Sequence, residues 1–113
     1  MILKSPNYPY PYGNYENCFW SFTFTKTKRV RIDFQYSLEG SLTGKCEHDY
    51  IEIFDGVNEN SKSIAKFCGE GTTGTIISTG SSLYVRFVSD SAQDLSGGVK
   101  SGFSIRINTT GNI

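Results

Sequence analysis

Apolar and polar residues alternate along several short stretches of this 113-residue chain, with the period of two that a half-buried β-strand requires. The clearest stretches are bounded by glycine, proline or polar residues, and they are 18–24, 30–34, 50–55, 64–68, 83–87 and 103–107. Nowhere do apolar residues recur with helical spacing over the length of a helix. The pattern therefore predicts an all-β fold, a two-sheet sandwich of antiparallel strands.

Polar and glycine-rich segments between these stretches predict how the strands connect. The polar turn at 26–29 separates the first two stretches, so we expect them to form an antiparallel hairpin. Segment 69–74 is rich in glycine and predicts a turn. In the first stretch, Trp20 is the expected core anchor and Phe19 falls on the outer face. Segment 5–15 holds all three prolines and four tyrosines, which predicts an extended loop packed through its tyrosines.

Composition and charge limit the classes of protein to consider. Eleven Lys and Arg balance eleven Asp and Glu, and no basic run of five or six residues occurs, so neither nucleic acid nor an anionic membrane is favoured as a partner; we expect the short basic turn at 26–29 to be a solvated loop. No window is apolar enough for membrane insertion, and the chain does not start like a signal peptide. We interpret residues 1–113 as a single domain with its core at about 5–108. Either a leader has been removed, or the chain is a piece of a longer protein.

The cysteines and one sequon bear on the cellular location. Cys18, Cys46 and Cys68 show no C-x-x-C spacing and the chain has a single histidine, which argues against zinc and leaves one disulfide and one spare cysteine. Asn108-Thr-Thr is a glycosylation sequon. Together these features favour a secreted protein or the extracellular part of a larger one. The alternative is a cytosolic protein with three reduced cysteines and a chance sequon.

Several short motifs, taken together and in order, resemble the CUB domain family. They are Ser5-Pro-Asn-Tyr-Pro, Cys18-Phe-Trp, Ile32-Asp-Phe, Asp49-Tyr-Ile-Glu-Ile-Phe-Asp-Gly after Cys46, Phe67-Cys-Gly, Leu83-Tyr-Val-Arg-Phe-Val-Ser-Asp and Gly102-Phe. Each motif alone is weak, but the series spans nearly the whole chain. The resemblance implies a jelly-roll-like sandwich of the CUB type, in a secreted or cell-surface protein, that mainly binds other proteins.

The resemblance also implies a role for each cysteine. CUB domains usually pair the first cysteine with the second and the third with the fourth. Cys46 and Cys68 match the third and fourth, which predicts a disulfide between them. Cys18 matches the second, whose partner would lie before Ser5, so we expect Cys18 to be unpaired in this chain. Truncation before Ser5 is our preferred explanation; natural loss of the first cysteine and a bond between molecules are the alternatives.

Calcium is the cofactor that the resemblance implies. The residues that match the ligands of calcium-binding CUB domains are Glu39, Asp49, Asp90, Ser91 through its carbonyl, and Gln93. Calcium takes six to eight oxygen ligands, which such a set supplies in part. Relatives usually have asparagine in place of Gln93, and Asp94 could compensate. Tyr8 matches a tyrosine that hydrogen-bonds a ligand carboxylate; its alternative role is a packed aromatic, and the acids could instead be unconnected loop residues.

These expectations lead to one main hypothesis and two alternatives. The main hypothesis is an extracellular, non-catalytic protein-binding module whose loops are ordered by calcium and which receives a lysine of its partner. The first alternative is a carbohydrate-binding module that uses exposed Tyr10, Tyr12 and Tyr15. The second is a purely structural module of a larger secreted or membrane-anchored protein. An enzyme is poorly supported, because the chain has no G-x-S-x-G motif and no nucleophile beside a base.

Overall fold

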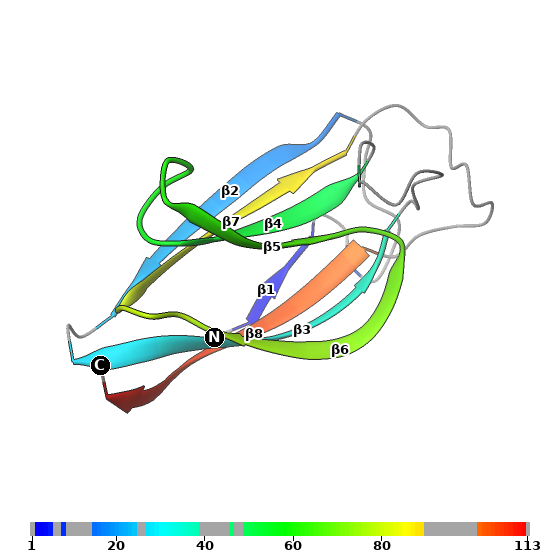
Figure 1. Cartoon of the computed structure of the whole chain (residues 1–113). Coiled ribbons are helices and arrows are strands. Elements are labelled where there is room, and N and C mark those ends of the chain that lie inside the picture. The colour runs from blue at the N-terminus through cyan, green and yellow to red at the C-terminus, as the bar shows by residue number, and fades with distance from the viewer. Residues whose placement is uncertain are drawn as a thin grey trace.

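Two antiparallel sheets face each other in the computed structural model, which describes residues 2–5, 8, 15–24, 27–38, 46, 49–89 and 102–112 (Figure 1). Within these residues the strands are β1 (Ile2–Lys4), β2 (Asn17–Thr23), β3 (Lys28–Ser37), β4 (Tyr50–Asp55), β5 (Lys62–Phe67), β6 (Glu70–Ile77), β7 (Ser82–Val88) and β8 (Gly102–Asn112). One sheet, the β3 sheet, has the order β1-β8-β3-β6, and the other, the β7 sheet, has the order β2-β7-β4-β5. The predicted two-sheet antiparallel sandwich is confirmed.

The core lies between the two sheets and contains one apolar face of each. Its fully buried side chains come from the alternating positions of β3, β4, β7 and β8, and they include Val30, Ile32, Ile51, Ile53, Leu83, Val85, Phe87, Phe103, Ile105 and Ile107. Phe103 of the β3 sheet packs edge-on against Trp20 and Phe87 of the β7 sheet, with ring centroids 5.8 and 5.1 Å apart. Trp20 itself is half-buried on the edge strand β2, so Phe103 is the central anchor of this core.

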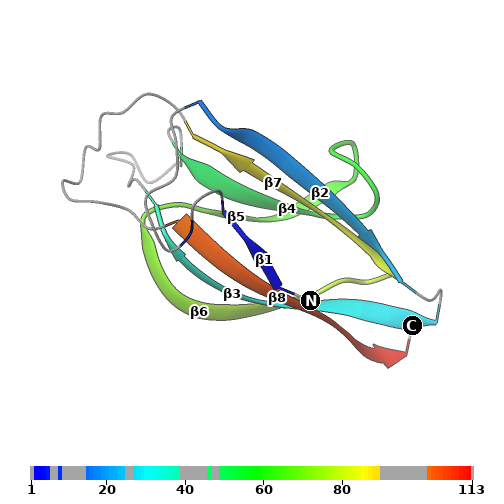
Figure 2. The same ribbon diagram turned by 180° about the vertical axis from the view of Figure 1, so that it is seen from behind.

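The hairpin predicted between 18–24 and 30–34 is wrong. Strand β2 pairs with β7, whereas β3 pairs with β6 and β8, so the two strands belong to opposite sheets (Figure 2). Both stretches carry an apolar face, and placing them in opposite sheets buries these faces against a common core. The backbone confirms the crossover, since Phe24 N donates to Ser81 O (3.0 Å) and Ser78 N donates to Val30 O (2.9 Å).

Most of the glycine-rich segment 69–74 is a strand rather than the predicted turn, because β6 begins at Glu70, directly after Gly69. Strand β6 pairs with β3 from Ile77, opposite Arg31, to Glu70, opposite Ser37. The ring of Phe34 occupies the space that a Cβ atom at Gly74 would need. Glycine at this position therefore allows an aromatic ring to approach the strand backbone closely. In the sequence, such a glycine cannot be distinguished from a turn glycine.

Strand pairing also extends beyond the expected core at both ends. Strand β1 pairs with β8, with Ile2 opposite Arg106 and Lys4 opposite Ser104. At the other end, Asn112 of β8 pairs with Lys28. The β3 sheet thus includes residues on both sides of 5–108.

Candidate functional site

The strand ends that carry the predicted site meet at one end of the sandwich. Strand β3 ends at Ser37, β4 begins at Tyr50 and β7 ends at Val88. Tyr50 pairs with Val88, so the start of β4 and the end of β7 are aligned. We call this region the loop end, and define it by the residues next to these strand termini: Ser5, Glu16, Leu38, Asp49 and Ser89.

Asp49 lies at the loop end directly before β4 and is only 5% exposed. A carboxylate with so little contact with water needs hydrogen bonds, an opposite charge or a cation to offset the cost of desolvation. The pairing of Tyr50 with Val88 brings Asp49 to the end of β7, where Ser89 follows. Asp49 is thus a buried carboxylate at the junction of β4 and β7.

Buried serines attach the neighbouring segments to the sheets. Ser89 N donates to Glu16 O (2.9 Å), and Glu16 N donates to Ser89 Oγ (2.8 Å), so the chain just before Asp90 is fixed to the chain just before β2. Ser5 makes a similar pair of bonds with Phe103, with Ser5 N donating to Phe103 O (3.0 Å) and Phe103 N to Ser5 Oγ (2.9 Å). Sequence analysis did not predict these roles, because no pattern distinguishes a tethering serine from a turn serine.

Tyr8 is held near the end of β1 by a turn and by a cation. Its backbone N donates to Ser5 O (3.1 Å), and the Lys4 ammonium lies 5.9 Å from the centroid of its ring. The side chain is half-buried. These contacts place Tyr8 beside Ser5 at the loop end.

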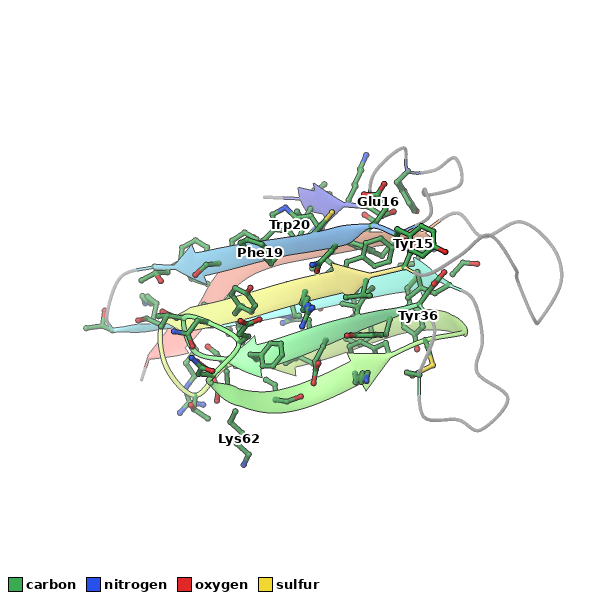
Figure 3. The ribbon with its side chains drawn as sticks, turned by 90° about the horizontal axis from the view of Figure 1, so that it is seen from above. Tyr15, Glu16, Phe19, Trp20, Tyr36 and Lys62 are labelled. Atoms are coloured by element: carbon green, nitrogen blue, oxygen red, sulfur yellow. A yellow bond between two sulfur atoms is a disulfide. The ribbon has the colours of Figure 1, made fainter. Side chains whose placement is uncertain are left out.

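The predicted disulfide between Cys46 and Cys68 is present, with the two Cα atoms 5.5 Å apart. It connects the chain that leads into Asp49 with the end of β5. Gly69 O accepts a hydrogen bond from Leu38 N (2.8 Å), which fixes the residue before Glu39 to the same place. Figure 3 shows the disulfide at the end of the sandwich where the labelled Glu16 and Tyr36 lie. The bridge thus supports the loop end from the side of the β7 sheet.

Cys18 is unpaired and half-buried on β2. Burial raises the pKa of its thiol, and the nearby negative charge of Glu16 and a hydrogen bond from Cys18 Sγ to Glu16 Oε2 (3.8 Å) raise it further. The thiolate is the nucleophilic form of cysteine. Cys18 is therefore poorly suited to nucleophilic or metal chemistry.

Four of the expected calcium ligands lie outside the described residues, namely Glu39, Asp90, Ser91 and Gln93. Of this set the structure places Asp49, together with Leu38 and Ser89, the residues that precede Glu39 and Asp90. In the part of the chain that the structure describes, no three His, Cys, Asp or Glu side chains are grouped to hold a metal. The proposed donors are all oxygen atoms, which is the chemistry that calcium prefers.

The structure describes some of the remaining predicted positions. Tyr15 is 76% exposed, as sugar stacking requires, whereas Tyr10 and Tyr12 lie outside the described residues. Asn108 of the sequon is exposed on β8, opposite Arg31 of β3.

Asp33, on the outer face of β3, has a lowered pKa. A hydrogen bond from Thr75 Oγ1 to Asp33 Oδ1 (2.6 Å) lowers the pKa of this carboxyl, and the neighbouring Arg31 guanidinium, 3.3 Å away, lowers it further. Asp33 lies on the outer face of the β3 sheet and is exposed to solvent. It belongs to a second polar surface, separate from the loop end.

Comparison with known proteins identifies the family. The sequence profile of the CUB domain matches residues 1–106. This chain belongs to the CUB domain family. The match covers every described strand from β1 to β7 and the first part of β8, so the family assignment and the observed sandwich agree.

Similar proteins carry the matched region within much longer chains. Human Tolloid-like protein 1 is 38% identical over 95 residues, which cover 84% of this chain and 9% of that protein. The chain therefore spans about a tenth of this relative. The full extracellular region of zebrafish Gpr126/Adgrg6 is 28% identical, with a TM-score of 0.78, over 98% of this chain and 14% of that one. The extracellular location predicted from the cysteines and the sequon is confirmed by such relatives.

One solved CUB domain similar to this chain contains calcium. The crystal structure of the MASP-1 CUB2 domain bound to Ca²⁺ superimposes with a TM-score of 0.78 at 27% identity, over 95% of this chain and 89% of that one.

Among the described residues of the present chain, no helix could span a membrane.

Proposed function

We propose that this CUB domain is an extracellular, non-catalytic protein-binding module whose loop end is ordered by one calcium ion. The observation that carries the proposal is the buried carboxylate of Asp49 at the junction of β4 and β7, in a domain similar in fold to a calcium-bound CUB domain. CUB domains are in general interaction modules rather than catalysts, and this chain is a member of that family.

Two of the proposed ligands directly follow described residues of the loop end. Leu38, the residue before Glu39, and Ser89, the residue before Asp90, are both buried at the end of the sandwich where Asp49 lies. The Ser91 carbonyl and the Gln93 amide would add oxygen ligands. A cation there would offset the repulsion among three carboxylates and hold the loops that bear them.

We further propose that the partner presents a lysine to this site. Three carboxylates carry one more negative charge than a calcium ion neutralises, and an ammonium group can meet the remaining charge. Tyr8, half-buried beside the end of β1, would support a ligand carboxylate through its hydroxyl. Asn108, exposed on the outer face of β8 opposite Arg31, is the proposed glycosylation position.

Calcium binding is tested by titrating the metal-free domain with calcium and measuring the heat. We expect one binding site per chain, and we expect Asp90→Ala to abolish the heat. The matched control is Glu59→Ala, which removes a carboxylate from the exposed β4–β5 turn, at the opposite end of β4 from Asp49. Loss of binding in both variants, or in neither, would contradict the assignment.

The lysine hypothesis is tested with a capped lysine peptide, followed by NMR, with a capped norleucine peptide as the uncharged control. We expect the lysine peptide to shift the amide resonances of Tyr8 and Ser89 when calcium is present. The norleucine peptide, or the lysine peptide with chelator, should leave them unchanged. Equal shifts with both peptides would show that the ammonium group is not what the site recognises.

A further inference from the structure

Charge is unevenly distributed over this electrically neutral chain. The outer face of the β3 sheet carries four exposed cations, and the single carboxylate described among them is Asp33. The cations are Lys4 of β1, Arg106 of β8, and Arg29 and Arg31 of β3. We call this surface the basic face. The core residues of β3 and β8 alternate with these cations, so the basic face is the reverse side of the core.

Strand register arranges the four cations in an oblique line. Arg106 pairs with Asp33, so Arg31, two residues before Asp33, is a diagonal neighbour of Arg106. Lys4 pairs with Ser104, two residues before Arg106, so Lys4 is the diagonal neighbour on the other side. Diagonal neighbours on one face of a sheet are about 7–8 Å apart. Arg29 continues the line along β3, which therefore crosses three strands.

A groove of about 430 Å³ meets this line at Arg106, the one cation of the four that lines it. Its hydrogen-bonding side chains are Asp33, Gln35, Thr75, Ser104 and Arg106. Part of the Asp33 carboxylate is already occupied, because its Oδ1 atom accepts the bond from Thr75 and contacts Arg31. The groove thus offers amide, hydroxyl and guanidinium groups beside a row of positive charge.

The outer face of the β7 sheet has no comparable excess of positive charge among its described residues. There, Arg86 Nη1 lies 3.9 Å from Glu59 Oε2. Glu52 pairs with Arg86 on one side and with Lys66 on the other. Cations on that face alternate with acids, so the net positive surface is a property of the β3 sheet.

We propose that the basic face binds a sulfated polysaccharide. A linear polyanion can follow the line from Lys4 to Arg29, with sulfates against the cations and sugar hydroxyls against the polar groups of the groove. Such polymers belong to the extracellular setting in which the relatives of this chain are found. Because the cations lie on strands, binding is independent of calcium, and the loop end stays open to a protein partner.

The test measures binding to heparin at several salt concentrations and uses the unglycosylated domain, because the sequon residue Asn108 lies on this face opposite Arg31. Arg29→Gln combined with Arg106→Gln removes two cations of the line. Lys62→Gln combined with Lys66→Gln is the matched control, since it removes the same charge from β5; Figure 3 shows Lys62 pointing away from the sheets. All four side chains are exposed, so both variants should melt like the wild type.

We expect the arginine variant to bind heparin roughly 10- to 30-fold more weakly. The slope of the logarithm of its binding constant against the logarithm of the salt concentration should become shallower by about one per arginine. The lysine variant should change less than about 3-fold. Desulfated heparin should not bind, and chelator should have no effect.

Equal losses in the two variants, or equal binding of DNA or anionic vesicles at the same salt, would overturn the proposal in favour of unspecific attraction. Loss of heparin binding in chelator would also overturn it, because the site would then be the loop end. A domain that binds heparin but not calcium would leave this proposal standing and would refute the proposed calcium site alone.

Discussion

Reduction of the Cys46–Cys68 disulfide should cost the domain a large part of its stability. The bridge encloses 21 residues between its cysteines, given their separation of 22 in sequence. On the chain-entropy estimate, closing a loop of that length in the unfolded chain stabilises the folded state by about 3 kcal/mol. A domain of this size has a total stability of about 5–15 kcal/mol. The bridge therefore contributes a substantial fraction of it.

The assay is urea unfolding of the wild-type domain, oxidised and reduced. The same side chains are present in both states, so the difference in free energy of unfolding reports the crosslink rather than lost packing. We expect the reduced form to be less stable by about 3 kcal/mol. Cys18→Ala is the control, because it removes the unpaired cysteine and keeps the bridge. A loss below about 1 kcal/mol on reduction would refute the reasoning.

Three further perturbations test other parts of the structure. Because burial raises the pKa of the Cys18 thiol above its ordinary value of 9.0, alkylation by iodoacetamide should be slow at pH 8 and should accelerate with a midpoint above pH 9. Asp33 has a lowered pKa, so its ionised form stabilises the fold above its ordinary pKa of 3.8, and this contribution is lost as the pH falls through the lower, folded value. Asp33→Asn should therefore melt below the wild type at neutral pH and approach it in acid. Gly74→Ala forces a Cβ atom into the Phe34 ring and should cost about 1–3 kcal/mol in urea unfolding, whereas Gly80→Ala, with open space around it, should cost much less.

Each of these has an outcome that would count against the structure. Rapid alkylation at pH 8 would mean that the Cys18 thiol is not buried beside a carboxylate. A constant gap in melting temperature between Asp33→Asn and the wild type down to strongly acid pH would contradict the lowered pKa. Similar stability of the two glycine variants would show that β6 does not approach the Phe34 ring as described.

Strand positions could be predicted from sequence because each strand buries one face. Leu83, Val85 and Phe87 alternate with residues that face outward. This local pattern predicts strand β7 without any knowledge of the strands that pair with it. Phe19 was likewise expected on the outer face, and it is 64% exposed.

Strand partners could not be predicted in the same way, because pairing depends on contacts between distant segments. The polar turn after 18–24 permits either a hairpin or a crossing to the other sheet, and only the shared core decides for the crossing. Gly74 carries a turn signal in sequence, yet its neighbour in space is Phe34, forty residues earlier. Information of this kind is absent from any local window.

The two candidate sites differ in how well they could be predicted from the sequence. Asp49 was recognised because it lies in a motif of the family, and the structure adds its burial and its place beside β7. The basic face was missed, since Lys4, Arg31 and Arg106 are single charges between core residues and form no run in the chain. Three strands bring them together, and the charge becomes visible in the folded sheet alone.

The most direct test of the proposed function is the melting temperature of the purified, oxidised domain in millimolar calcium and in excess chelator. A ligand that binds the native state alone stabilises it by about 2.7 kcal/mol at a concentration a hundred times its Kd. For a domain of this size that corresponds to a rise of roughly 10 °C. A clear rise in calcium would support an ion held by Asp49 and the loops beside it, whereas coincident melting curves would contradict the account.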